Sequence, residues 1–565
     1  MGKDLQRALL WVILFTSCFM LWDNYQVYKG GKSFFQGSQQ ESVAQTSTTD
    51  TVPGSTTTAT TNAVAATEVV QPSAPVVVKT DLLKVTFDLA GASMVQNEFV
   101  KIPQQADWKE VGLAGLILGK KEDAALGNVE LLEMNNNRTY LAQTGVVGGD
   151  FPTHKDNFKL VSTKTDMGSD NELEVVFEAE KGSLKVTKTY TFKRGEYDVG
   201  LKTTITNTGD KAVSPSIYYQ IVRDGGNPVG ANSFASTFTG PAVYTSEDKF
   251  QKLKFDDIKD NSASFARKAN NGWIAMIQHH FVSAWIPKQG EDRTNYVGTV
   301  GNGLYRIGTM VTKAELAPGA SVTDDAVFYS GPQNQARLEQ LAPGLELVVD
   351  YGWLTFLAKP IYWLLSMLHS VVGNWGWSIV LLTCIVKLIL YPISAASYRS
   401  MARMKEVTPR MKALQDLYKD DKQRLNQAMA ELYRTEKINP VSGCLPMFLQ
   451  IPVFLALYWV LLGSVELRGA PWILWIHDLG MPDPWFILPL IMAGTMFLQI
   501  FLNPKPTDPA MAKVTYIMPL VFSVMFFVFA SGLVLYWLTN NVLSILQQWW
   551  INKTIEADRQ KRATR

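Results

Sequence analysis

One lysine stands inside a long apolar stretch of this sequence. Residues Trp375 to Ser394, WGWSIVLLTCIVKLILYPIS, are apolar nearly throughout and carry one formal charge, Lys387. A helix of that length can cross a bilayer, and Lys387 would then lie about 10 Å from its Ser394 end. A lysine at the centre of a spanning helix costs about 2.5–3.5 kcal/mol, so a compensating environment is expected. The ammonium either reaches the lipid headgroups on its flexible stem or serves a functional site as a fixed positive charge.

Polar side chains in the last apolar segment could share a site with this lysine. They recur at helical spacing over an arc of roughly 140°, and they are Tyr536, Trp537, Asn540, Asn541, Ser544, Gln547 and Gln548. Thr383 precedes Lys387 by one helical turn, Tyr391 follows it by one turn, and Gln450 adds a polar group to an earlier segment. Because polar groups in spans are expensive unless they face one another or water, we expect one hydrated cavity around Lys387. The alternative is ordinary hydrogen bonding between helices.

Other chemical motifs in the sequence are weak. Residues 115–121, GLILGKK, resemble a phosphate loop but are one residue short. His279 and His280 are adjacent, so on a strand they would face opposite ways and could not chelate together. Cys18, Cys384 and Cys444 all lie in or beside apolar segments. We therefore expect no catalytic residue, no metal, no cofactor and no disulfide framework. A net charge of only +2 over 565 residues also argues against a nucleic-acid-binding polycation.

The N-terminal half of the chain reads as an anchored, exported domain. Residues 1–22 carry basic residues ahead of an apolar run without a cleavage site, which predicts an uncleaved membrane anchor. Residues 23–76 are rich in Ser, Thr, Gln and Ala and should be a flexible linker. Residues 77–330 alternate with period two between turn signals, which predicts a large antiparallel β-sandwich. Residues 331–372 are a polar hinge followed by an amphipathic helix, kinked at Pro360, in the membrane interface.

The C-terminal part alternates apolar segments with one charged insertion. We predict a transmembrane helix at 373–394, a cytoplasmic helical hairpin at 395–444, four more spans within 445–551 and a basic cytoplasmic tail at 552–565. Excess positive charge in the hairpin, in the loop at 503–513 and in the tail places both termini of the chain in the cytoplasm.

The hairpin carries methionines that could offer an adaptable surface to apolar clients or the ribosome, beside basic residues. These residues are Met401, Arg403, Met404, Lys405, Met411 and Met429. Ordinary packing of the two hairpin helices is the alternative for the methionines.

Long blocks of the C-terminal region resemble the YidC/Oxa/Alb family of membrane protein insertases. In order, the blocks are IVKLILYPIS, EKINPVSGCLPMFLQIPVFLALYWVL, GSVELRGAPWILWIHDL and SGLVLYWLTNN. The anchor, the linker and the β-rich region resemble the Gram-negative form of this family. The likeness therefore covers essentially the whole chain, closely after about residue 345 and loosely before it.

The resemblance implies a multi-pass α-helical protein in the bacterial inner membrane, with a five-helix core and a periplasmic β-supersandwich similar to sugar mutarotases. Family members have a hydrophilic groove, closed to the outside, that usually contains one arginine; the motif places Lys387 there. The charge persists, but the bidentate arginine fork is lost. Trp537 stands where a tyrosine is common in the family. The implied activity is insertion and folding of nascent membrane proteins without nucleotide, by a functional monomer that works alone or with the Sec translocase and contacts the ribosome.

Two other functions deserve a test. A transporter or channel could use Lys387 as a counter-charge for its substrate, but such proteins usually show internal repeats, and none is found among these spans. A tethered sugar-modifying enzyme would depend on the β-rich domain, and deletion of residues 77–330 would then abolish all activity.

Overall fold

The computed structural model describes residues 75–105, 127–135, 138–226, 237–301, 303–419, 421–436, 445–502 and 509–563, together with residues 53, 112–113 and 228. These residues divide into two compact units: a β-rich unit, with residues 75–105 and 127–349, and a helical unit, with residues 112–113 and those from Asp350 onward. Three expectations lie outside the described residues: the anchor at 1–22, nearly all of the linker and the imperfect phosphate loop at 115–121.

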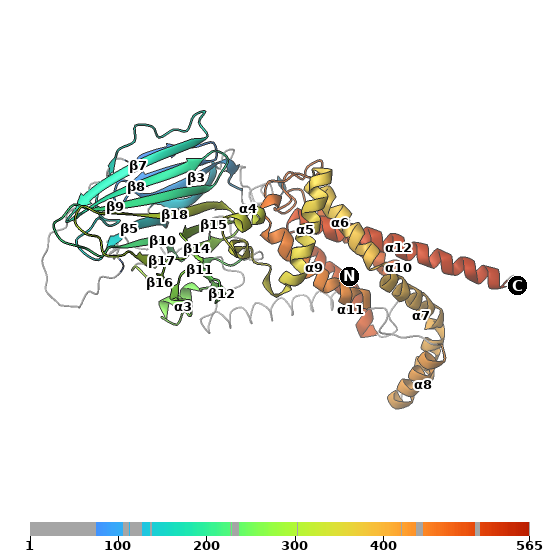
Figure 1. Ribbon diagram of the computed structural model, residues 1–565. Helices are drawn as coiled ribbons and strands as arrows, with labels where there is room; N and C mark the ends of the chain where they lie inside the picture. Colours follow the sequence, from blue (N-terminus) through green and yellow to red (C-terminus); the bar gives the residue numbers. More distant parts are fainter. Residues whose placement is uncertain are drawn as a thin grey trace. The chain divides into compact units, whose positions relative to one another are not determined.

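The β-rich unit is a sandwich of two nine-stranded sheets whose paired strands are antiparallel, as predicted. The first sheet runs in the order β1 (Val76–Lys79), β2 (Leu83–Asp88), β3 (Ser93–Pro103), β4 (Asn128–Met134), β5 (Thr139–Val147), β10 (Ser216–Asp224), β17 (Leu304–Thr312), β16 (Arg293–Thr299) and β13 (Lys268–Ala269). The second runs in the order β12 (Lys249–Lys252), β11 (Gly240–Thr245), β14 (Trp273–Gln278), β15 (Phe281–Pro287), β18 (Ser321–Pro332), β9 (Asp198–Asn207), β8 (Leu184–Lys193), β7 (Glu172–Lys181) and β6 (Lys159–Leu160). Figure 1 shows β7, β8 and β9 side by side. A short helix, α3 (Phe255–Lys259), lies between β12 and β13.

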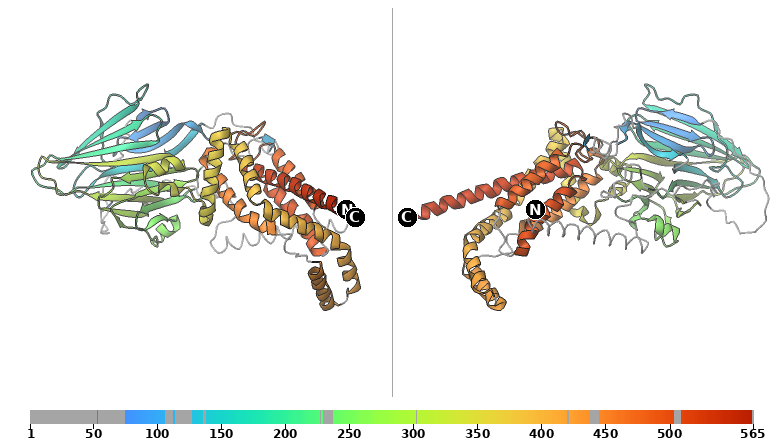
Figure 2. Two further views of the ribbon diagram at one scale, coloured as in Figure 1. Left: turned by 45° about the vertical axis from the view of Figure 1, so that its right-hand side comes forward. Right: turned by 180° about the vertical axis from the view of Figure 1, so that it is seen from behind.

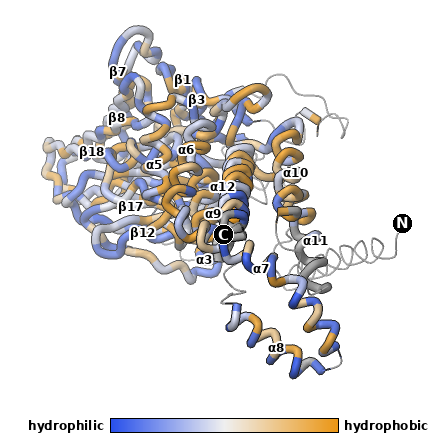
Figure 3. Tube along the Cα trace, turned by 90° about the vertical axis from the view of Figure 1, so that its right-hand side faces the viewer, coloured by the Kyte–Doolittle hydropathy of each residue, from blue (hydrophilic) through white to orange (hydrophobic). Residues whose placement is uncertain are grey.

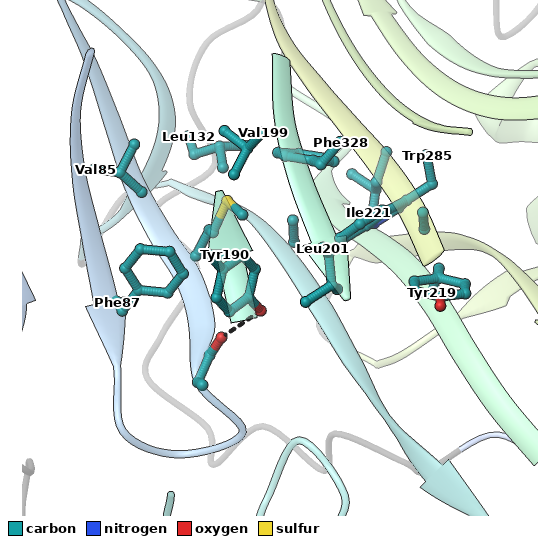
Figure 4. Close-up of a cluster of buried hydrophobic side chains, with 14 of the residues drawn as sticks. Val85, Phe87, Leu132, Tyr190, Val199, Leu201, Tyr219, Ile221, Trp285 and Phe328 are labelled. Carbon is teal, nitrogen blue, oxygen red and sulfur yellow. Dashed lines mark hydrogen bonds between the residues drawn. The ribbon is translucent and has the colours of Figure 1, made fainter. Parts of the chain in front are cut away.

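Side-chain alternation along the strands builds the core between the two sheets. In β8 every second residue from Leu184 to Phe192 is buried, as period-two patterning requires. Phe87 of the first sheet meets Tyr190 of the second, with ring centroids 4.7 Å apart (Figure 4). The Tyr190 hydroxyl donates a hydrogen bond to the Ala92 carbonyl at 2.9 Å, which satisfies its one buried polar group.

A lysine, Lys188, interrupts the apolar face of β8 and lies in the core. Its side chain is fully buried, and Nζ donates hydrogen bonds to the carbonyl oxygens of Gly91 at 2.7 Å and Thr144 at 2.8 Å. The ammonium also lies 4.5 Å from the ring centroid of Phe158. Burial lowers the pKa of this ammonium to about 7, because the charged form loses its hydration.

The histidine pair is not on a strand, contrary to the prediction. His279 and His280 form the two-residue turn between β14 and β15, and their ring centroids are 3.8 Å apart. His280 takes a left-handed backbone conformation with φ of 65°, which closes such a tight turn. Among the described residues, no cluster of His, Cys, Asp or Glu could hold a metal ion.

The region between the sandwich and the first long helix is more broken than its amphipathic pattern predicts. β18 continues to Pro332, and α4 (Gln335–Leu341) occupies the expected polar hinge, with the Asn334 side chain capping it by accepting from the Arg337 N–H. Two short 3₁₀ turns follow, η2 (Leu345–Val348) and η3 (Gly352–Leu354). The amphipathic helix α5 (Thr355–Val372) starts only after them and contains Pro360.

The helical unit continues with α6 (Trp375–Ile389), α7 (Tyr391–Leu417), α8 (Lys422–Thr435), α9 (Leu445–Gly463), η5 (Val465–Leu467), α10 (Ile487–Leu502), α11 (Pro509–Met525) and α12 (Ser531–Ala563). The long α12 runs to the C-terminal end of the described chain (Figure 2). Colouring by hydropathy shows α10 hydrophobic along its length and α8 alternating in character (Figure 3). The apolar runs predict spans at Leu445–Gly463 and Val514–Ala530; α9 has the first pair of bounds, whereas α11 begins and ends five residues before the second.

The Lys387 segment is bent rather than one straight helix. Helix α6 ends at Ile389, and α7 starts at Tyr391 at an angle of 67° to it. Pro392 explains the break, because proline lacks the N–H that a continuous helix would need and fits the first turn of a new one. By length and composition this bent pair could cross a membrane, whereas none of the described helices passes the same test alone.

Candidate functional site

Lys387 lies in the last turn of α6, next to the bend, rather than in the middle of a straight span. The carbonyl end of a helix carries partial negative charge, so a cation is favoured at this position. The Lys387 ammonium donates a hydrogen bond to Ser544 Oγ on α12 at 2.8 Å. The Ser544 hydroxyl in turn donates a hydrogen bond to the Asn540 carbonyl oxygen at 2.7 Å. The lysine is partly buried and points toward α12 rather than along α6 into an apolar surface.

The rest of the polar face of α12 is divided among other helices. Tyr536 receives a hydrogen bond from the Gln450 amide of α9, and Asn541 donates to Thr495 Oγ1 of α10 at 3.3 Å. Gln548 donates to the Leu502 carbonyl at the end of α10 at 3.4 Å. These contacts are bonds between helices, the alternative to one common cavity that the spacing left open. The Lys387–Ser544 hydrogen bond between α6 and α12 differs from these contacts because its donor is charged.

Three buried polar atoms of α12 have no hydrogen-bond partner within the described part of the chain. They are Trp537 Nε1, Asn540 Oδ1 and Gln547 Nε2. The Trp537 ring packs against Phe454 at 4.7 Å and Phe526 at 5.4 Å, so its N–H has no freedom to turn elsewhere. A buried polar group without a partner costs about 1–3 kcal/mol. Their hydrogen bonds would be completed if water or the polar groups of a bound chain reached this face of α12.

The two polar neighbours of Lys387 on its own segment play smaller parts. Thr383 is buried, and its hydroxyl donates to the Ile379 carbonyl at 2.7 Å inside α6. Tyr391 is 42% exposed at the start of α7. Sequence reasoning left two residues out of the site. Thr495 was visible as a polar residue in an apolar segment, whereas Tyr398, buried with Ala395 against Ile551 of α12, carries no such signal because it lies in the charged stretch.

The end of the bundle opposite Lys387 is covered by the chain between α9 and α10, residues 464–486. Asn374, which caps α6 through the Trp377 N–H, also donates to the Pro471 carbonyl at 3.2 Å. Ser531 at the start of α12 donates from its N–H and its hydroxyl to the Met481 carbonyl, at 2.7 and 2.8 Å. This outer loop therefore covers the N-terminal ends of α6 and α12.

Two further residues fix the outer loop in place. The buried carboxylate of Asp483 accepts from the N–H groups of Trp485 and Leu488, at 2.9 and 2.7 Å, and so caps the start of α10. Gly376 packs against Trp472 so closely that a side-chain Cβ there would lie 2.2 Å from the indole. Glycine is therefore required at this position for the loop to approach α6.

The hairpin methionines lie mostly in the contact between the hairpin helices. Met411 is 5% exposed and packs with Val407, and Met404 and Met429 pack against the same pair. Met401 instead packs on the cluster that joins α7 to Ile551 of α12. This packing agrees with the alternative of a hairpin core, in which Met411 is buried and Met401, Met404 and Met429 are partly exposed; a contact surface for clients or the ribosome stays a prediction.

Two basic residues are also predicted to lie on the hairpin surface. Arg403 is exposed on α7, and the side chain of Lys405 lies outside the described part of the structure.

Two family models match consecutive parts of the chain. The model of the 60Kd inner membrane protein matches residues 367–559, and that of the YidC periplasmic domain matches residues 75–364. Curated relatives named "Membrane protein insertase YidC" match over nearly the full length. The relative from Bordetella avium (strain 197N) is 50% identical, with 99% of this chain and 100% of the relative covered. The relative from Cupriavidus necator (strain ATCC 17699) is 48% identical, with 98% of each chain covered.

A solved structure of an active YidC insertase, with its first transmembrane domain resolved, covers 84% of this chain and 92% of its own chain. Its sequence identity is 20% and its TM-score is 0.39. At that score the assignment depends on the sequence comparisons alone.

Proposed function

This chain belongs to the YidC family of membrane protein insertases, and from that premise we propose that it inserts clients through a polar groove centred on Lys387. The observation that carries this proposal is the Lys387–Ser544 hydrogen bond between α6 and α12; the same helix α12 carries the unpartnered polar atoms of Trp537, Asn540 and Gln547. A fixed positive charge, with unfilled hydrogen-bonding positions on the helix that it contacts, suits an acidic, polar segment of a nascent membrane protein.

We place this groove in an inner-membrane protein of six spans, with both termini in the cytoplasm and the β-supersandwich in the periplasm. Large apolar side chains are exposed on several helices, where a water-soluble surface would carry charges. Examples are Phe356 and Trp363 of α5, Leu490 of α10 and Val524 of α11. Acyl chains cover these side chains in the proposed arrangement, with α5 in the interface.

Insertion begins on the side where the charge lies. The client's short outer segment enters from the hairpin side, where its carboxylates meet the Lys387 ammonium, and its peptide groups pair with Asn540, Trp537 and Gln547. Water and hydrogen bonds in the groove shorten the apolar distance that this segment must cross. The outer loop keeps the far end closed until the segment passes.

Two forces drive the client onward. Moving an acidic segment outward gains about 2.3 kcal/mol per charge for each 100 mV of membrane potential. The apolar helix of the client then leaves along α9 and α11 into lipid, gaining about 0.8 kcal/mol for each buried CH₂ group. The hairpin receives the nascent chain at the ribosome, and the protein acts as a monomer, alone or beside the Sec translocase.

Substitution of Lys387 tests the role of the charge. Lys387→Ala should slow insertion of clients with acidic outer tails about tenfold, the effect of losing about 1.4 kcal/mol of attraction. Lys387→Arg should retain most activity, because the charge remains. Lys359→Ala is the matched control, since Lys359 is exposed on α5 and lies outside the groove. Equal losses for acidic-tailed and neutral-tailed clients would contradict the charge role.

A further inference from the structure

A buried carboxyl group connects α5 to the outer loop. Glu466 lies in η5, directly after α9, and its Oε1 accepts a hydrogen bond from the Tyr362 hydroxyl of α5 at 2.9 Å. Its Oε2 has no exposed surface and no partner within the described residues. The insertase chemistry proposed above uses neither residue.

The surroundings of Glu466 favour the uncharged acid. From α5 the Tyr362 hydroxyl faces it, Ser366 lies beside Tyr362, and the backbone N–H of Glu466 is the remaining donor. Asp478 offsets part of the cost of burying Arg468, the next charged residue of the loop. A buried carboxylate with so little compensation is costly, and burial raises the pKa of the Glu466 carboxyl above its ordinary value.

The position of this contact gives it a role in closure. The outer loop is held on α6 by Asn374, on α12 by Ser531 and on α10 by Asp483. The Tyr362–Glu466 contact adds α5, the helix whose exposed side carries Phe356 and whose buried side packs in the bundle.

We propose that Tyr362 and the buried carboxyl group of Glu466 form a latch that holds α5 on the outer loop and keeps that end of the bundle closed during insertion. The inference rests on the proposed function for its purpose, but the latch itself can be tested without any client. Both are positioning residues, because they act through the loop.

Thiol labelling tests the latch. The background replaces Cys18, Cys384 and Cys444 by serine, and the reporter is Ser378→Cys, at a fully buried position in the first turn of α6. A membrane-impermeant maleimide is added from the outside to intact protein in proteoliposomes, and the rate of labelling is measured.

The expected labelling rates separate the chemistry of the latch from simple packing. Tyr362→Phe and Glu466→Ala should increase the labelling rate of the reporter about tenfold. Glu466→Gln should retain the slow rate of the unsubstituted latch, because its amide oxygen still accepts from Tyr362 and no charge is involved. Tyr516→Phe, at a 45% exposed tyrosine of α11, is the control and should change nothing.

The pH dependence of the labelling rate distinguishes a latch that contains a carboxyl group from simple packing. A carboxyl group with a raised pKa stabilises the closed state while protonated and loses that effect as the pH rises. The ratio of the labelling rate with Glu466 to the rate with Glu466→Gln should therefore increase with pH, and the ratio cancels the pH dependence of the thiol itself.

The proposal is overturned if Glu466→Gln labels as fast as Glu466→Ala, if Tyr362→Phe stays as slow as the unsubstituted latch, or if the ratio is constant with pH. A defect of Lys387→Ala in insertion, with unchanged labelling at position 378, would separate failure of the groove from failure of the latch.

Discussion

Replacement of the buried Lys188 by methionine should remove a pH dependence from the stability of the β-rich domain. In the folded state burial lowers the pKa of this ammonium from 10.5 to about 7. In the unfolded chain the lysine keeps its ordinary pKa, so between pH 7 and pH 10.5 the unfolded state binds more protons. The free energy of unfolding therefore rises with pH in this window. Methionine keeps the unbranched shape beside Phe158 and carries no proton.

The magnitude follows from the two pKa values. Between pH 7 and pH 9, linkage gives about 2 kcal/mol of added stability for one lysine with this shift. Lys188→Met should lose that rise, whatever its effect at pH 7. That effect combines the removal of a buried charge with the loss of donors to Gly91 and Thr144. The test therefore compares how the free energy of unfolding of the wild type and of the variant changes with pH, and not the free energy of either protein at one pH.

Urea denaturation of residues 75–349, followed by the fluorescence of the buried Trp273 and Trp285, measures this difference at pH 7, 8 and 9. The β-rich unit is compact and has its own hydrophobic core, so it can be studied alone. Lys185→Met is the matched control, because Lys185 lies on the same strand with its side chain 42% exposed, paired with Glu178. Parallel pH profiles for wild type and Lys188→Met would refute the reasoning.

Two further substitutions probe the remaining buried contacts. Lys313→Met should destabilise the β-rich domain by about 3–5 kcal/mol in urea denaturation, because Asp324, 1% exposed, keeps its charge and loses its cation. Lys288 is exposed nearby, so Lys288→Met is the control and should cost little stability. Equal losses of stability for the two variants would count against the ion pair. Met411→Lys should open the hairpin, because it places a charge at a buried position, and limited proteolysis should detect faster cleavage between α7 and α8. Leu417→Lys, at a 70% exposed site on α7, is the control. Equal cleavage rates for the two variants would contradict the closed hairpin.

Local patterns in the sequence predict the strands of the sandwich and show that Lys188 interrupts one of them. The period-two alternation from Leu184 to Phe192 predicts a strand with one buried face, and the structure confirms it. Lys188 occupies an inward position of that alternation, so its burial was readable from the sequence. The two carbonyl groups that accept its hydrogen bonds are distant in sequence, at Gly91 in the turn between β2 and β3 and at Thr144 in β5, and no local pattern could predict them.

The helical part shows the limit of hydropathy as a signal. The apolar run from Trp375 to Ser394 predicts one helix, because hydropathy does not register a change of direction. The signal for the bend was present in Pro392, which starts α7 well. The correction matters for the site, because it moves Lys387 from the interior of a span to the last turn of α6.

The polar arc of α12 shows a different limit. Helical spacing predicts that Tyr536, Ser544 and Asn541 share one broad face, but it cannot say which neighbour each of them meets. In the structure they meet α9, α6 and α10 in turn. Neighbours are set by the packing of whole helices, which the spacing within one segment does not encode.

The ends of α6 explain how a lysine can be kept between apolar helices when no carboxylate among the described residues pairs with it. Its amino end is capped by Asn374 and covered by the outer loop, and its carboxyl end carries Lys387. The helix dipole and the Ser544 hydroxyl stabilise the ammonium in part, because a dipole and a neutral acceptor compensate a charge less than a carboxylate does. The incomplete compensation leaves attraction available to an acidic client. A carboxylate introduced by Ser544→Asp would pair with the Lys387 ammonium and cancel its attraction for an acidic client. The proposed groove therefore requires an uncharged residue at position 544.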